Sequence, residues 1–275
     1  MCGSTIFVKI RQTKEKGTGI KRKARKNPTL ESVMLINQRN AEIDLSMKLN
    51  HNFVGGDVHA VLTYKELLPK EKMKKELDKF IRALRRRMRT DEGKELKLIH
   101  ATEYENARPH HHIVCNVQDI HMLEKLWSAG WIKTSVLDDS RDYRKLAEYI
   151  IKETSKTFRN PDAFMSRRYS CTRSIKTPAS KVEEVSAVRL VADPRPIKGY
   201  YIDRDSVYRG ENPFSGMPYL EYVMISDNAE APRLTHWRRG KTVRRKGQNY
   251  SGWIRQNMPQ QLVIGDLSKS LNEAF

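Results

Sequence analysis

The sequence contains little cysteine, no long apolar run and no nucleotide-binding loop. Its three cysteines, Cys2, Cys115 and Cys171, are far apart and form no Cys-x-x-Cys pair, which excludes a disulfide framework and a cysteine-rich zinc site. No apolar run approaches the roughly 18 residues of a membrane-spanning helix. The absence of a Gly-x-x-x-x-Gly-Lys-Ser/Thr segment excludes an ATP-driven motor of the P-loop kind.

Acidic residues are scarce relative to basic ones. The 275 residues include 52 Lys and Arg but only 33 Asp and Glu, a formal net charge of +19. A solubilising surface rarely needs more than about 8 net charges, so the excess indicates a polyanionic partner. The apolar segment Thr5–Val8 is too short for a secretory signal, so we expect a cytoplasmic protein with no membrane contact. For such a chain the polyanion is nucleic acid.

Basic residues concentrate near both ends of the chain. Nine of the eighteen residues in 9–26 are Lys or Arg, and glycines interrupt any periodicity, so residues 1–28 are predicted to form a flexible basic arm that follows phosphates. Residues 233–255 contain eight basic and no acidic residues, interleaved with aromatic rings on which bases could stack. The predicted DNA-binding residues are Lys21, Arg22, Lys23, Arg25, Arg238, Arg239, Arg244, Arg245, Trp237 and Trp253.

The middle of the chain alternates between helical and strand periodicities. The pattern predicts, in chain order, a helix over 29–50, a strand near 58–63, a long helix from 69, strands over 96–104 and 109–117, a short helix over 119–127, a strand over 131–137 and a helix over 141–156. This order predicts an α+β fold in which helices pack against a largely antiparallel sheet. Segments near 200–202 and 219–225 suggest strands of a small accessory region, assigned to residues 183–275.

Three consecutive histidines begin the second strand of the predicted hairpin. Side chains alternate along a strand, so His110 and His112 share one face while His111 points to the other, with the apolar stripe. Two imidazoles about 7 Å apart can converge on one cation. Glu103 on the neighbouring strand is the best third ligand, and two nitrogens with a carboxylate suit Mg²⁺ or Mn²⁺. The alternative is a surface cluster that binds metal adventitiously.

A tyrosine and a lysine lie one turn apart on the last predicted helix. Tyr149 and Lys152 are at i and i+3 and therefore lie on one face. A phenol with a pKa near 10 is a poor nucleophile at neutral pH, which a nearby ammonium and a metal-polarised phosphate would remedy. Tyr143 lies on another face of this helix and is predicted to be a core residue rather than a second nucleophile. Ordinary helices also contain Tyr-x-x-Lys, so the motif has meaning only together with the histidines.

These features together resemble the rolling-circle replication initiators of the HUH endonuclease superfamily, of the bacterial plasmid and phage type. That family shows, in chain order, a strand like His59-Ala60-Val61-Leu62-Thr63-Tyr64, a histidine pair after a proline, and Tyr-x-x-Lys on a helix. Residues 168–174 also resemble a segment that follows the catalytic helix in such proteins. The resemblance covers residues 29–182 and implies an endonuclease domain there, with a ferredoxin-like antiparallel sheet.

The resemblance implies a role for each site residue. His110, His112 and Glu103 would hold a divalent metal, Mg²⁺ or Mn²⁺, that polarises the scissile phosphate. Tyr149 would attack the phosphorus and form a 5′-phosphotyrosine with a free 3′-hydroxyl, and Lys152 would steady the negative charge. The substrate would be single-stranded DNA at an origin hairpin. A separate host helicase and polymerase would act with the protein in the cytoplasm of a bacterial cell that carries the mobile element.

Other functions remain open from the sequence. Where the family has an apolar residue this chain has His111, and strand alternation favours His110 and His112 as the ligand pair. A conjugative relaxase or a single-tyrosine transposase would use similar chemistry, but relaxases usually place the tyrosine before the histidines and such transposases are shorter. A non-enzymatic nucleic-acid-binding protein with structural histidines is the alternative of another class.

Overall fold

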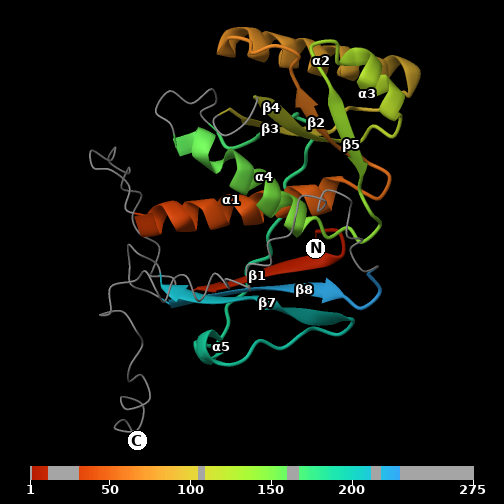
Figure 1. Cartoon of the computed structure of the whole chain (residues 1–275). Coiled ribbons are helices and arrows are strands. Elements are labelled where there is room, and N and C mark those ends of the chain that lie inside the picture. The colour runs from red at the N-terminus through yellow and green to blue at the C-terminus, as the bar shows by residue number, and fades with distance from the viewer. Residues whose placement is uncertain (1, 12–30, 105–108, 160–166, 212–217, 230–275) are drawn as a thin grey trace, which may run out of the picture. The chain divides into compact units, whose positions relative to one another are not determined.

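The structure is a computed structural model, and it describes residues 2–11, 31–104, 109–159, 167–211 and 218–229. The chain divides into two compact units, residues 1–236 and 237–275, and every described residue lies in the first. The helices are α1 (Glu31–Asn52), α2 (Lys70–Asp91), α3 (Ile120–Leu126), α4 (Arg144–Arg159) and α5 (Val188–Val191). The strands, which with the helices are labelled in Figure 1, are β1 (Thr5–Arg11), β2 (Val58–Thr63), β3 (Leu98–Glu103), β4 (His110–Cys115), β5 (Ile132–Val136), β6 (Ser170–Cys171), β7 (Tyr200–Glu211) and β8 (Pro218–Ser226).

A five-stranded sheet with the order β5-β2-β4-β3-β6 forms the centre of the fold. Every neighbouring pair of these strands is antiparallel. The predicted hairpin is present as β3 and β4, in a register that pairs Glu103 with His110. The predicted α+β class with a largely antiparallel sheet and flanking helices is therefore confirmed.

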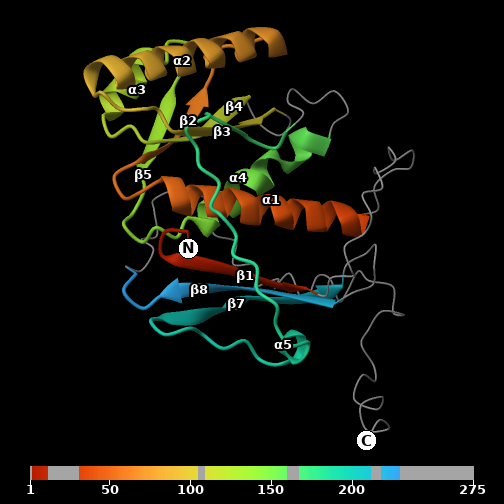
Figure 2. The ribbon, with the colours of Figure 1, turned by 180° about the vertical axis from the view of Figure 1, so that it is seen from behind.

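Helices α2 and α3 cover one face of this sheet (Figures 1 and 2). The apolar positions of α2 recur every three or four residues, so they form one stripe, and Met73, Leu77, Phe80, Leu84 and Met88 are all buried. They pack against the inward side chains of β2 and β4 and against Trp127 at the end of α3. Asp119 caps α3 as predicted, by accepting a hydrogen bond from the backbone N–H of Met122 at 3.2 Å.

Helices α1 and α4 lie on the opposite face of the sheet and pack against each other (Figures 1 and 2). Their buried residues include Leu45 and Leu49 of α1 and Leu146, Ile150 and Ile151 of α4. The five-stranded sheet therefore has helices on both faces, and side chains of β2, β3 and β4 that point toward α4 share a separate environment from the apolar core under α2. None of the described helices combines the length and apolarity that crossing a bilayer requires.

A second, three-stranded sheet has the order β1-β8-β7, and it corrects the prediction for the start of the chain. Residues 5–11 form strand β1, antiparallel to β8, rather than part of a flexible arm over residues 1–28. Ile6, Val8 and Ile10 alternate along β1 and pack against Leu220 and the other buried residues of β8. Residues 12–30 lie outside the described residues. The predicted accessory strands near 200–202 and 219–225 are present as β7 and β8.

The segment that follows α4 returns to the edge of the five-stranded sheet. Strand β6 pairs with β3 through Cys171 opposite Ile99 and Ser170 opposite His100. The hydroxyl of Tyr169, just before β6, donates a hydrogen bond to Asp44 of α1. This segment, residues 168–174, therefore links the edge of the sheet to α1.

Candidate metal centre and tyrosine

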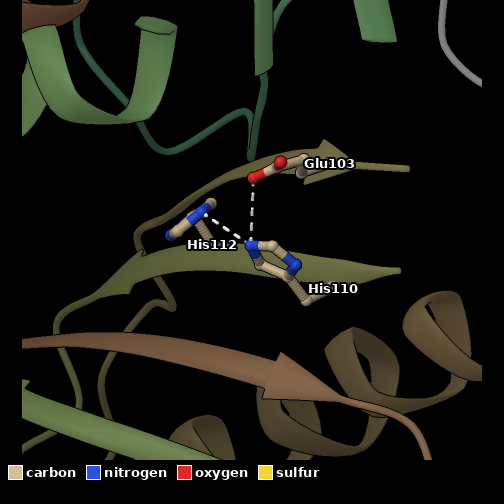
Figure 3. A group of neighbouring side chains, drawn as sticks. All are labelled: Glu103, His110 and His112. Atoms are coloured by element: carbon tan, nitrogen blue, oxygen red, sulfur yellow. Dashed lines mark hydrogen bonds and ion pairs between the residues drawn. The ribbon is translucent and has the colours of Figure 1, made fainter. Parts of the chain in front are cut away.

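Glu103, His110 and His112 bring one donor atom each to a common point. The antiparallel register sets Glu103 directly across from His110, and His112 follows two residues later on the same face of β4. His110 Nε2 lies 3.2 Å from Glu103 Oε2 and 3.2 Å from His112 Nε2 (Figure 3). The three donor atoms all lie within 4.8 Å of one another, so one ion could contact all three.

The environment of this cluster favours neutral imidazoles beside a carboxylate. Glu103 and His112 are buried, and His110 is partly exposed. Burial, together with the neighbouring histidines, holds the pKa of His112 well below its usual range, so its ring keeps a lone pair at neutral pH. Two imidazole nitrogens and a carboxylate oxygen are donors that fit a divalent transition-type cation or Mn²⁺, and the partly exposed side leaves room for further ligands.

His111 points to the opposite face of the sheet, as strand alternation predicts. It is fully buried in the core under α2, and its ring edges meet Tyr64 and Thr102. His111 Nε2 lies 2.7 Å from the Tyr64 hydroxyl, and His111 Nδ1 lies 2.8 Å from Thr102 Oγ1. The ring is therefore a hydrogen-bonded core residue and contributes nothing to the metal cluster.

His100 of β3 lies on the same face as His111 and provides a test of the buried histidines. Burial lowers the pKa of His100 to about 4, and its buried Nδ1 has no hydrogen-bond partner in the described part of the chain. The unfolded chain takes up this proton below pH about 6.5, whereas the folded protein does so only near pH 4, so stability falls as the pH drops through this window. We expect His100 alone to account for about 2 to 3 kcal/mol of this loss at pH 4.

Urea unfolding measured between pH 7 and pH 4 checks this expectation. The His100→Leu variant should show a shallower loss of unfolding free energy on acidification than the unaltered protein. His121→Leu is the matched control, because that side chain is exposed on α3 and its replacement should leave the slope unchanged. Equal slopes for the unaltered protein and His100→Leu would contradict the burial argument.

His59 and Ser135 adjoin the cluster, and the sequence reasoning did not assign them a role. His59 Nε2 lies 3.4 Å from His112 Nδ1, and His59 Nδ1 lies 3.2 Å from Ser135 Oγ. Burial lowers the pKa of His59 to about 4, so this ring is neutral. The signal was present: His59 stands at the start of the first family motif, on the face of β2 that alternation assigns to the metal cluster.

Tyr149 of α4 lies against the metal cluster. Its ring meets the ring of His112 edge to face, with centroids 5.3 Å apart and an interplanar angle of 88°. Burial raises the pKa of the Tyr149 hydroxyl, and the charges of Glu153 and Glu103 raise it further. The influence of Glu103 means that the phenol and the cluster share one electrostatic environment. Lys152, one turn further along α4, is exposed.

The other sequence-predicted residues divide into three groups. Tyr143 is a core residue as predicted, with its hydroxyl donating to the backbone oxygen of Asp138 at 2.8 Å. Trp131 flanks a turn and its sequence context predicts a packing residue, but 55% of its surface is exposed. The basic and aromatic residues predicted to bind DNA lie outside the described residues: Lys21, Arg22, Lys23, Arg25, Arg238, Arg239, Arg244, Arg245, Trp237 and Trp253.

Comparison with known proteins gives a match to a family of replication proteins. The model of the family described as Replication-associated protein, of the ORF2 type, matches residues 57–158. The matched range begins just before β2 and ends within α4, so it includes the metal cluster and Tyr149. No curated protein and no solved structure matches the chain. The family match supports a protein of the replication-initiator type.

Proposed function

We propose that this protein initiates rolling-circle replication by nicking and rejoining single-stranded DNA through a 5′-phosphotyrosine. The observation that carries the proposal is the edge-to-face contact between Tyr149 and His112, because it brings a phenol next to a three-ligand cluster of the kind that holds a divalent cation. Two unrelated segments of the sequence, a hairpin and a later helix, supply these groups. The match to a replication-associated family over the same residues supports the proposal.

The reaction is a transesterification. The Tyr149 oxygen attacks the phosphorus, the bond between phosphorus and the 3′ oxygen breaks, and the DNA 5′ end remains on the enzyme. The phenolic proton passes to water, and the departing 3′ oxygen takes up a proton, so no net proton is consumed. The ester energy is kept in the phosphotyrosine, and attack by a 3′-hydroxyl reverses the reaction without ATP.

Each residue of the chain has a definite task in this step. His110, His112 and Glu103 hold the cation, and a bound cation supplies electrostatic stabilisation of the phosphate and offsets the charge of Glu103. That offset bears on Tyr149, because Glu103 is one of the charges that raise the pKa of its hydroxyl. Lys152 on the exposed side of α4 is suited to the extra negative charge that develops on the phosphate oxygens.

The partners of the reaction follow from the same chemistry. The substrate is single-stranded DNA at an origin hairpin, with the basic segments of residues 12–30 and 233–255 following its backbone. The free 3′-hydroxyl is a primer for a host polymerase, and a separate helicase unwinds the duplex, since the chain contains no P-loop. The protein works in the cytoplasm of a bacterial cell that carries the plasmid, phage or integrated element.

A covalent-adduct assay tests the proposal. The full chain is incubated with 5′- and 3′-labelled single strands that contain hairpins, with Mn²⁺, and separated in SDS. A nicking enzyme gives an SDS-stable adduct that carries only the label downstream of the nick, together with a free 3′-hydroxyl fragment. Bound DNA with no adduct on any origin-type strand would instead favour a non-enzymatic binding protein.

A further inference from the structure

A chain of hydrogen bonds runs away from the metal cluster behind His112. His112 Nδ1 lies 3.4 Å from His59 Nε2, His59 Nδ1 lies 3.2 Å from Ser135 Oγ, and the Ser135 hydroxyl lies 3.4 Å from the backbone oxygen of His59. The ring planes of His59 and His112 differ by only 6°, which suits an N–H of one ring directed at the lone pair of the other. The chain crosses three neighbouring strands, β4, β2 and β5.

The direction of this chain follows from what His112 must do in the cluster. A neutral imidazole carries one ring hydrogen, and a metal-binding Nε2 requires that hydrogen on Nδ1. The Nδ1–H of His112 then donates to Nε2 of His59, which places the hydrogen of His59 on Nδ1, facing Ser135. The Ser135 hydroxyl accepts that bond and donates its own hydrogen to the backbone. Every donor in the chain then has an acceptor.

We propose that His59 and Ser135 are positioning residues that hold His112 in the tautomer and rotamer that present Nε2 to a cation. This inference depends on the metal site of the proposed function, and it adds residues that neither the motif nor the three-ligand cluster includes. Without an acceptor at position 59, the hydrogen of His112 can move to Nε2, where it faces Nε2 of His110 and blocks the ligand position.

Calorimetric titration of the full chain with Mn²⁺ alone tests the proposal. His59→Phe keeps a ring of similar size but removes the acceptor, and we expect Mn²⁺ to bind about 10- to 100-fold more weakly. His59→Gln restores an acceptor and should recover part of the affinity. Ser135→Ala should cause a smaller loss. Its matched control is Thr134→Ala, the adjacent β5 residue opposite Ala60 on the other side of the sheet, which should bind as the unaltered protein does.

Ring-nitrogen NMR of the metal-free protein gives a readout that folding alone does not move. It should report hydrogen on Nδ1 of His112 in the unaltered chain and a mixture of tautomers in Ser135→Ala and His59→Phe. Hydrogen on Nε2 of His112 in the unaltered chain overturns the proposal even where a variant fails to fold. Strong Mn²⁺ binding that His59→Phe does not change refutes the relay and leaves the proposed function standing. No Mn²⁺ binding by the unaltered protein refutes both.

A separate observation concerns the outer surface of α2. Six exposed cations follow one another at alternating intervals of three and four residues, so they form a row along the helix: Lys72, Lys75, Lys79, Arg82, Arg86 and Arg89. The row lies directly opposite the buried stripe of α2 and extends over about 26 Å at 1.5 Å per residue. In the described part of the chain, Arg86 and Arg89 make no ion pair.

From this row we infer a contact surface for the phosphate backbone of double-stranded DNA, an inference that takes DNA as the partner from the proposed function. The length of the row is comparable with one turn of the duplex, about 34 Å. The only aromatic residue of α2, Phe80, is buried, so the surface has no ring on which an unstacked base could lie. Since α2 covers the face of the sheet opposite the metal cluster, duplex bound here leaves the cluster accessible.

Salt-dependent binding of a 20-base-pair duplex tests this surface. The variant with Lys75, Arg82, Arg86 and Arg89 all changed to Gln should bind duplex at least about tenfold more weakly, with a shallower dependence of affinity on salt, by about 3 in the logarithmic slope. Its adduct yield on short single strands should persist. The control carries four Gln replacements at exposed cations elsewhere: Lys65, Lys125, Lys133 and Lys181. Equal losses in the two variants, or no loss in the α2 variant, would refute the surface.

Discussion

Changing Tyr149 to Phe should abolish the covalent DNA adduct while leaving the affinity for single-stranded DNA nearly unchanged. Phenylalanine keeps the ring that packs edge to face on His112 and removes only the oxygen that attacks phosphorus. Loss of a nucleophile lowers a reaction by far more than loss of a contact, so adduct formation should fall by at least about 10³-fold. The measurement is adduct yield against time on a labelled origin strand, beside a filter-binding affinity for the same strand.

Tyr143→Phe is the matched control for this experiment. Tyr143 is the same residue type at the start of the same helix, but it is buried and its hydroxyl donates to the backbone oxygen of Asp138. That variant should lose about 1 kcal/mol of stability and keep its adduct yield. If the adduct persisted in Tyr149→Phe and disappeared in Tyr143→Phe, the assignment of the nucleophile would be wrong. Persistence in both would direct attention to another nucleophile.

The pH dependence of adduct formation should follow from the environment of Tyr149. Burial and two nearby carboxylates raise the pKa of its hydroxyl, so the phenolate fraction at neutral pH is small and should grow with rising pH. The same carboxylates explain why a cation at the cluster would matter to the nucleophile as well as to the phosphate, since it offsets the charge of Glu103. This links the metal requirement and the tyrosine in one electrostatic argument.

The local patterns of the sequence were sufficient for the centre of the fold and for the ligand cluster. Strand alternation separates His110 and His112 from His111, and hairpin pairing brings Glu103 opposite His110, because both effects depend only on residues close in sequence. The helical stripe of α2 is likewise a local signal. Such features are predictable without knowledge of the rest of the chain.

The features that the sequence reasoning missed depend on contacts between distant segments. Strand β1 has an alternating pattern, but its partner β8 is about 210 residues further along the chain, and the nearby basic residues dominate the local composition. Ser135 reaches the site only because β5 pairs with β2. A periodicity argument gives the face of each strand but not the order of strands in the sheet, and the strand order decides which second-layer residues meet the ligands.

Removing any ligand of the cluster should weaken both metal binding and nicking. We expect His112→Ala to have the largest effect, because His112 is buried, donates a nitrogen to the cluster and supports the ring of Tyr149. Mn²⁺ affinity should fall by at least about 100-fold, and adduct yield at a fixed Mn²⁺ concentration by about 10²- to 10⁴-fold. Glu103→Gln keeps the shape of the side chain and removes its charge, so it should weaken Mn²⁺ binding with little loss of stability.

His111→Leu is the control that separates the metal site from the histidine triplet as a whole. His111 is adjacent in sequence to both ligands, yet its hydrogen bonds are to Tyr64 and Thr102 on the other face of the sheet. Its replacement should lower the unfolding free energy by about 1 to 3 kcal/mol through the unpaired partners, and leave Mn²⁺ affinity unchanged. Adduct formation that survives exhaustive chelation, or Mn²⁺ affinity lost equally in His111→Leu and His112→Ala, would mean that the cluster of Glu103, His110 and His112 is structural. In that case Tyr149 would have to act without a metal, against the raised pKa of its hydroxyl.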